Sequence, residues 1–108
     1  MMHIRSSTRG DTATVSLRGE LDHHSALSAR RELDLLLRDP AIRNLNLELS
    51  ELEFMDSSGI GLILARYRKV RDRGGRMRLL SPRPAVDQVL ALSGVYQLME
   101  KEGSYGQD

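Results

Sequence analysis

The sequence contains no cysteine and no tryptophan, and its aromatic rings are limited to one phenylalanine and three tyrosines. The lack of cysteine excludes disulfide bonds, thiolate catalysis and Cys-ligated zinc. With so few rings, the hydrophobic core must be aliphatic. No segment approaches the roughly 18 consecutive apolar residues that span a bilayer, and residues 1–7 lack the apolar stretch of a signal peptide. We therefore expect a cytoplasmic protein that does not enter the membrane.

Length and composition indicate one globular unit. The 108 residues suffice for one compact domain and are too few for two. Hydrophobic residues make up 40% of the chain and charged residues 29%, values typical of a folded globular protein. We predict a single domain over residues 1–108, with a frayed C-terminal tail over about 101–108.

Positive charge is concentrated in one segment, although the net charge is only +1. Residues 65–78 carry many basic side chains against one acidic residue, Asp72. Nucleic-acid sites usually add aromatic side chains on which bases stack, and these are nearly absent here. We interpret this segment as a solvated helix face and expect no direct contact with nucleic acid; its basic residues are Arg66, Arg68, Lys69, Arg71, Arg73, Arg76 and Arg78.

Hydrophobic periodicity predicts strands alternating with helices. Residues 12–21 and 42–52 alternate apolar and polar side chains, as strands do, whereas 25–38, 60–73 and 84–93 have helical spacing. Three further strands are expected at 3–8, 76–81 and 95–100, the first paired with 12–21 through a turn at Gly10 and Asp11. This order predicts an α/β domain with a mixed, mostly parallel sheet of four or five strands.

Two adjacent serines stand where a strand passes into a helix, in the segment "FMDSSGIG". One hydroxyl can cap the helix. The other can point outward, with Gly59 and Gly61 leaving room for another protein to approach. A phosphate on the outward hydroxyl would be stabilised by the positive end of the helix dipole. A docked partner would have to desolvate the added negative charge, which would weaken binding. The motif therefore suits a phosphorylation switch.

Catalytic and metal sites are weaker interpretations of the same residues. Asp22, His23, His24, Asp56 and Ser57 include every residue type of a Ser-His-Asp triad, but aspartate replaces the first glycine of a Gly-x-Ser-x-Gly elbow. The "DHH" triplet lacks the i, i+4 histidine spacing of a helical zinc site. We interpret it as a turn in which Asp22 or Ser25 caps the first helix. No phosphate-loop motif is present.

The segments "GELDHHSA", "FMDSSGIGLILARY" and "SPRPAVDQVLALSGV" closely resemble the bacterial anti-sigma factor antagonists, small single-domain STAS proteins, and especially their sporulation type. The resemblance covers roughly Val15–Met99. It implies a mixed sheet with helices packed on one side, no catalytic activity and no cofactor. Such proteins bind an anti-sigma factor that is also a serine kinase and thereby release a sigma factor. The kinase uses ATP to phosphorylate the antagonist, and a serine phosphatase restores it.

The resemblance also implies a role for individual residues. The phosphoacceptor is the first serine after the aspartate, Ser57, and its neighbour Ser58 caps the helix. Asp22 contacts an arginine of the kinase, and Asp56 orients the hydroxyl while the kinase supplies the general base. The family further suggests that the free protein is a monomer. The expected partner-binding residues are Asp22, His23, His24, Asp56, Ser57, Ser58 and Gly59.

Two questions stay open at this point. Family members usually continue into a further C-terminal helix, whereas this sequence ends in "EKEGSYGQD", so the cover of one sheet edge is undetermined. "GELDHH" favours the sporulation type. The alternatives are an antagonist of a stress-response or other partner-switching pathway, and a STAS binding module that is independent of phosphorylation.

Overall fold

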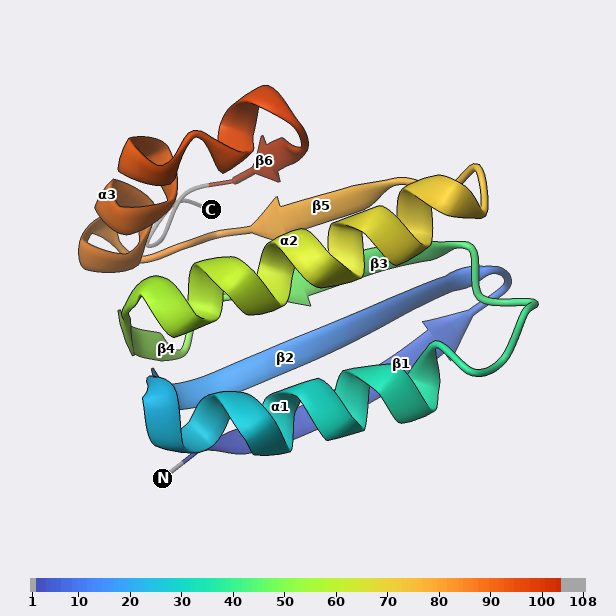
Figure 1. The fold of residues 1–108 in the computed structure, drawn as a ribbon, viewed down its shortest axis with the longest axis horizontal. Helices are drawn as coiled ribbons and strands as arrows, with labels where there is room; N and C mark the ends of the chain where they lie inside the picture. The colour runs from blue at the N-terminus through green and yellow to red at the C-terminus, as the bar shows by residue number, and fades with distance from the viewer. Residues whose placement is uncertain (1, 104–108) are drawn as a thin grey trace.

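The computed structural model describes residues 2–103. Strands and helices follow one another nearly as the periodicity predicts, and Figure 1 shows their arrangement. The elements are β1 (His3–Arg9), β2 (Thr12–Leu21), α1 (His23–Leu36), β3 (Asn44–Glu48), β4 (Leu52–Met55), α2 (Ser57–Asp72), β5 (Met77–Leu80), α3 (Pro84–Ser93), the 3-10 turn η1 (Val95–Gln97) and β6 (Glu100–Glu102).

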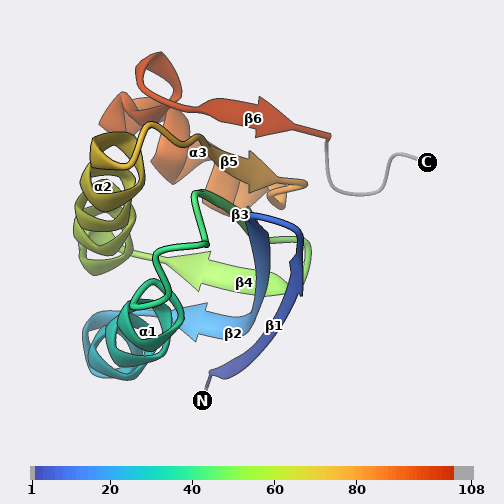
Figure 2. The same cartoon turned by 90° about the vertical axis from the view of Figure 1, so that its right-hand side faces the viewer.

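The sheet is mixed and mostly parallel, which confirms the predicted fold class. Its strand order is β1-β2-β3-β5-β6, with β4 paired to the far end of β2. Among the strands of residues 2–103, only β1 runs antiparallel to its neighbour, through the turn at Gly10 and Asp11. The pairs β2–β3, β2–β4, β3–β5 and β5–β6 are parallel. Helices α1 and α2 lie side by side on one face of this sheet (Figures 1 and 2).

The prediction of one strand over residues 42–52 is wrong, and this explains the sixth strand. After β3 the chain makes a turn in which Leu52 N–H donates to the Leu49 carbonyl, and Glu51 accepts from Gly19 N–H. The chain then resumes as β4, beside Gly19–Leu21 of β2, where the register shifts between Gly19 and Glu20. Strand β2 therefore pairs with β3 along its first half and with β4 at its end.

The core is aliphatic, as the composition predicts. Alternate residues of β2 and β3 point toward the helices and are fully buried, because side chains alternate between the faces of a strand. Each fully buried leucine stabilises the fold by about 1.5–3 kcal/mol relative to an exposed one. The inward residues of these two strands and the loop that follows are Ala13, Val15, Leu17, Leu21, Leu45, Leu47 and Leu49.

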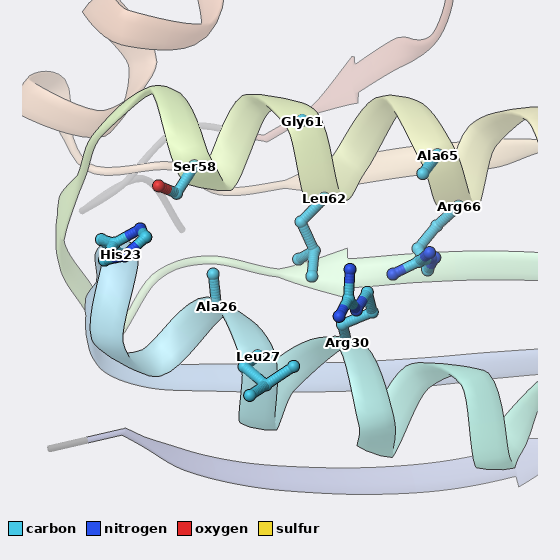
Figure 3. Close-up of a pocket in the computed structure, with 9 residues that line it drawn as sticks. All are labelled: His23, Ala26, Leu27, Arg30, Ser58, Gly61, Leu62, Ala65 and Arg66. Atoms are coloured by element: carbon cyan, nitrogen blue, oxygen red, sulfur yellow. The ribbon is translucent and has the colours of Figure 1, made fainter.

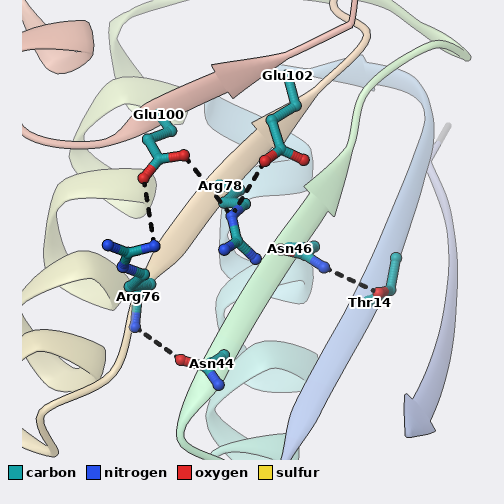
Figure 4. A network of polar contacts seen from close by, with 7 residues as sticks. All are labelled: Thr14, Asn44, Asn46, Arg76, Arg78, Glu100 and Glu102. Atoms are coloured by element: carbon teal, nitrogen blue, oxygen red, sulfur yellow. Dashed lines mark hydrogen bonds and ion pairs between the residues drawn. The ribbon is translucent and has the colours of Figure 1, made fainter.

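The opposite face of the sheet carries polar side chains (Figure 4). Asn46 donates from Nδ2 to Thr14 Oγ1 at 3.4 Å, and Arg78 Nε lies 3.2 Å from Glu102 and 3.8 Å from Glu100. Arg78 thus joins β5 to the edge strand β6. All three β6 residues are exposed and charged, which discourages pairing with another sheet edge.

Two predictions for the C-terminal part are corrected. Residues 95–97 form the 3-10 turn η1, in which Gln97 N–H donates to the Gly94 carbonyl and Leu98 N–H donates to the Val95 carbonyl. This turn buries both Val95 and Met99. The last strand is therefore β6, not residues 95–100, and Lys101 and Glu102 are ordered strand residues within the predicted tail. The rest of that tail, 104–108, lies outside the described residues. Within residues 2–103, no helix combines the length and apolar character needed to cross a bilayer.

Candidate functional site at two helix N-termini

Helix α2 begins at the two serines, and its cap is Asp56. The Asp56 backbone is extended, and its Oδ1 accepts a 2.8 Å hydrogen bond from Ser58 N–H. The prediction that Ser58 caps the helix is therefore wrong: an aspartate caps as well as a serine does, and Asp56 precedes both serines. Ser57 and Ser58 are instead the first two residues of the helix.

The two serines differ in exposure. Ser57 is exposed and makes no hydrogen bond through its side chain to the residues that the structure describes. Ser58 is half-buried and faces α1, where it lines a groove between the two helices (Figure 3). An external enzyme can reach the Ser57 hydroxyl without moving any element of the fold.

The two glycines after the serines have different roles. Gly59 is buried, and a Cβ added there would lie 2.6 Å from Met55 Cγ and 2.9 Å from Leu21 Cδ2. Its lack of a side chain lets α2 pack closely on β2 and β4, so it does not belong to an exposed contact surface as predicted. A Cβ at exposed Gly61 would meet nothing within 4 Å. Gly61 is the glycine that leaves the surface open.

Helix α1 begins with a reciprocal cap. Asp22 Oδ1 accepts from the N–H groups of His24 at 3.0 Å and Ser25 at 2.9 Å, and Ser25 Oγ accepts from Asp22 N–H at 3.0 Å. Both candidates for the cap thus take part. The hydrogen bond from Ser25 N–H is the main reason that the pKa of Asp22 lies below its ordinary value. His23 and His24 are exposed, with ring centroids 5.9 Å apart.

Strand pairing brings these two helix N-termini together. Leu21 at the end of β2 pairs with Met55 at the end of β4, and Asp56 N–H donates to the Leu21 carbonyl at 3.2 Å. The caps Asp22 and Asp56 directly follow this pair, at the carboxyl ends of parallel strands where α/β proteins commonly place their sites. The structure therefore brings the predicted loop 22–24 beside the predicted serines. His23 and Ser58 line the same groove (Figure 3).

The prediction of a solvated basic face is wrong for part of α2. Arg66 is only 4% exposed, and its Nε lies 3.4 Å from Asp34 Oδ1 of α1, which also accepts from Lys69 Nζ at 2.8 Å. Arg73 donates to the carbonyls of Leu37, Asp39 and Ile42. These side chains face α1 because that helix and the loop after it supply the acceptors. Arg68 and Arg71 are exposed.

Comparison with known proteins identifies the family. The family model described as "STAS domain" matches residues 3–105. The chain belongs to the STAS-domain family. An anti-sigma F factor antagonist of Paenibacillus polymyxa is 39% identical over 79% of this chain and 73% of its own length. An anti-sigma F factor antagonist of Lysinibacillus sphaericus is 36% identical over 79% of this chain and 73% of its own length. An anti-sigma-B factor antagonist of Bacillus subtilis is 26% identical over 80% of this chain and 77% of its own length.

Solved structures agree with this membership. The STAS chain superposes on the anti-sigma factor antagonist SpoIIAA in its unphosphorylated form with a TM-score of 0.80 and 33% identity, over 94% of this chain and 87% of that one. The match to phosphorylated SpoIIAA from Bacillus has a TM-score of 0.72 and 32% identity, over 94% and 90%. The fold and family predicted from the sequence are thereby confirmed.

Proposed function

We propose that this STAS protein is an anti-sigma factor antagonist, a regulatory binding protein rather than an enzyme, whose binding is switched off by phosphorylation of Ser57. The observation that carries the proposal is the exposed Ser57 at the start of α2, beside a second helix N-terminus. Relatives that are 39% and 36% identical bear the name anti-sigma F factor antagonist. SpoIIAA, which is similar in fold and sequence, exists in phosphorylated and unphosphorylated forms.

The position of Ser57 explains how the fold could accept a phosphate. The first N–H groups of a helix have no partner within the helix, and the positive end of the helix dipole stabilises a nearby anion by about 0.3–1 kcal/mol. The neighbouring Asp56 carboxylate is also negatively charged and therefore repels a phosphate on Ser57. A docked partner would have to desolvate the phosphate's added charge of nearly −2 next to this carboxylate, which disfavours the complex far more than the free protein.

The proposed contact surface consists of the caps and first turns of α1 and α2. Its residues are Asp22, His23, His24, Asp56, Ser57 and Ser58. The hydrogen bonds to the Asp22 side chain all reach Oδ1, which leaves Oδ2 for a cation such as an arginine of the partner. This geometry supports Asp22 as the charge contact.

The partner in this proposal is an anti-sigma factor that is also a serine kinase, and a serine phosphatase restores the unmodified protein. The higher identity to anti-sigma F antagonists than to the Bacillus subtilis anti-sigma-B antagonist supports a pathway of the sporulation type over a stress-response pathway. The kinase would supply ATP and the general base, so the STAS protein needs only to present the hydroxyl.

Incubation with ATP and each candidate kinase, followed by peptide mass spectrometry, tests the phosphoacceptor. We expect one added phosphate on Ser57, none in Ser57→Ala, and unchanged modification in the matched control Ser58→Ala. Phosphate on Ser58 of the unaltered protein would show that the other serine is the acceptor. Lack of modification by every anti-sigma kinase of the host would contradict the switch.

A further inference from the structure

A groove between α1 and α2 has features of a small-ligand site, and of the residues that line it only His23 and Ser58 also belong to the proposed contact surface. Its volume is about 490 Å³, within the range of about 300–1,000 Å³ typical of small-molecule sites. Residues from both helices line it: His23, Ala26, Leu27, Arg30, Ser58, Gly61, Leu62, Ala65 and Arg66. The walls are mostly apolar, and none of the described residues that line it is acidic.

Arg66 is the residue that points to a ligand. Its side chain is 5% exposed, and Nε and Nη1 are shut off from solvent without a hydrogen-bond partner in the described part of the chain. Nε has only an ion-pair contact, 3.4 Å from Asp34 Oδ1, and Lys69 uses the same oxygen at 2.8 Å. One carboxylate therefore serves two cations. A buried guanidinium with unmet donors is costly. An acceptor in the groove would remove that cost after a rotation that turns these nitrogens toward the groove.

Arg30 adds a second cation to the same place. Figure 3 shows its guanidinium extending from α1 toward that of Arg66, which extends from α2. Burial is the main cause of a lowered pKa for Arg66; Asp34 opposes this effect, and the charge of Arg30 adds to it. Two guanidiniums that face each other repel unless an anion lies between them. A carboxylate can accept hydrogen bonds from both.

The apolar walls define the rest of the ligand. Ala26 and Leu62 project into the space between the helices, and Leu62 lies between Ala26 and the Arg30 guanidinium (Figure 3). Leu27 is 44% exposed although it lines the groove, so its apolar surface is available to an occupant. Leu62 is only 6% exposed, so a simple inorganic anion would leave mainly the Leu27 side chain uncovered. An anion with a short aliphatic or aromatic tail would cover that apolar surface and gain hydrophobic free energy.

We propose that the α1–α2 groove binds a small carboxylate with an apolar tail, held at its charged end between Arg30 and Arg66 and along its tail by Leu27 and Leu62. The carboxylate would bond to the guanidiniums after a small rotation of the Arg66 side chain. Because the groove lies between the helices and requires no other protein for its walls, binding does not depend on the anti-sigma factor.

Titration of the ¹⁵N-labelled protein with hexanoate tests the site. We expect shifts centred on the amides of Ala26, Gly61 and Ala65, with a Kd of about 1 mM or below. Hexanol and hexylamine have the same tail without the anionic end and should bind at least about tenfold more weakly. Acetate, which lacks the tail, should also be weaker. Equal binding of hexanol and hexanoate would overturn the proposal.

Two variants separate the site from a general charge effect. Arg30→Gln should weaken hexanoate about tenfold, whereas Arg31→Gln, which removes the same charge from the next exposed position of α1, should leave Kd within about twofold. Arg66→Met should abolish binding, with circular dichroism as the check that it folds. Equal effects of Arg30→Gln and Arg31→Gln, or no hexanoate binding up to about 20 mM, would refute the site. Neither result would alter the proposal for Ser57.

Discussion

Replacement of each of the two α2 glycines by alanine should change stability in opposite directions. A methyl at Gly59 would lie 2.6 Å from Met55 Cγ and 2.9 Å from Leu21 Cδ2, both closer than carbon atoms normally approach. Overpacking of this kind costs about 1–3 kcal/mol. The alanine also gains about 1 kcal/mol in helix propensity, which leaves Gly59→Ala destabilised by up to about 2 kcal/mol.

Gly61→Ala is the matched control because it makes the same chemical change in the same helix. Its Cβ would meet nothing within 4 Å, so only the propensity gain of about 0.5–1 kcal/mol remains. Urea denaturation should place Gly59→Ala below Gly61→Ala by about 1–3 kcal/mol in the free energy of unfolding, or roughly 4–12 °C in Tm. If Gly59→Ala is as stable as Gly61→Ala, close packing of α2 on β2 and β4 is not the reason for the buried glycine.

Three further predictions concern the helix caps and one half-buried tyrosine. Asp56→Ala should lower the free energy of unfolding by about 1 kcal/mol, whereas Ser58→Ala should lower it less, because Asp56 and not Ser58 caps α2; the reverse order in urea denaturation would contradict this cap. The lowered pKa of Asp22 means that its stabilisation is present above its ordinary pKa of 3.8 and is lost as pH falls below that value. The stability difference between the unaltered protein and Asp22→Asn should therefore shrink below pH 3.8, and a constant difference would argue against it. Burial is the main reason that the pKa of Tyr96 lies above its ordinary value of 10.0, and the hydrogen bond to Asp87 adds to the effect. The folded state therefore holds the hydroxyl proton more tightly than the unfolded state does. The stability that this proton gives to the fold is lost as pH rises above 10.0. Tyr96→Phe should be less stable than the unaltered protein at pH 8, by a margin that narrows in alkaline solution; a margin that widens would contradict the sign.

Much of the fold follows from local patterns in the sequence. The alternation in β2 and the helical spacing after the serines reflect which side chains face the core. This periodicity can be recognised directly in the order of the residues. The break between β3 and β4 was missed because Leu49 and Leu52 are both buried across a turn, so the apolar residues continue while the backbone changes strand partner. The partner strand, not the local pattern, decides such a break.

Some features of the candidate site could likewise be predicted from the sequence, and others could not. The proximity of loop 22–24 to the serines followed from the resemblance, and the structure explains it by the pairing of Leu21 with Met55. The choice of Asp56 over Ser58 as the cap could not be made from propensity, since both residue types cap well. The burial of Arg66 depends on where α1 packs, which no spacing within α2 reveals.

The affinity of the anti-sigma factor for the unmodified protein, compared with its affinity for the protein carrying one phosphate on Ser57, tests the central claim most directly. Titration calorimetry with both forms at the same ionic strength gives the two Kd values. A switch that turns a regulator off should weaken binding about a hundredfold to a thousandfold, equivalent to about 3–4 kcal/mol. Equal Kd values for the two forms would contradict the proposed role of Ser57.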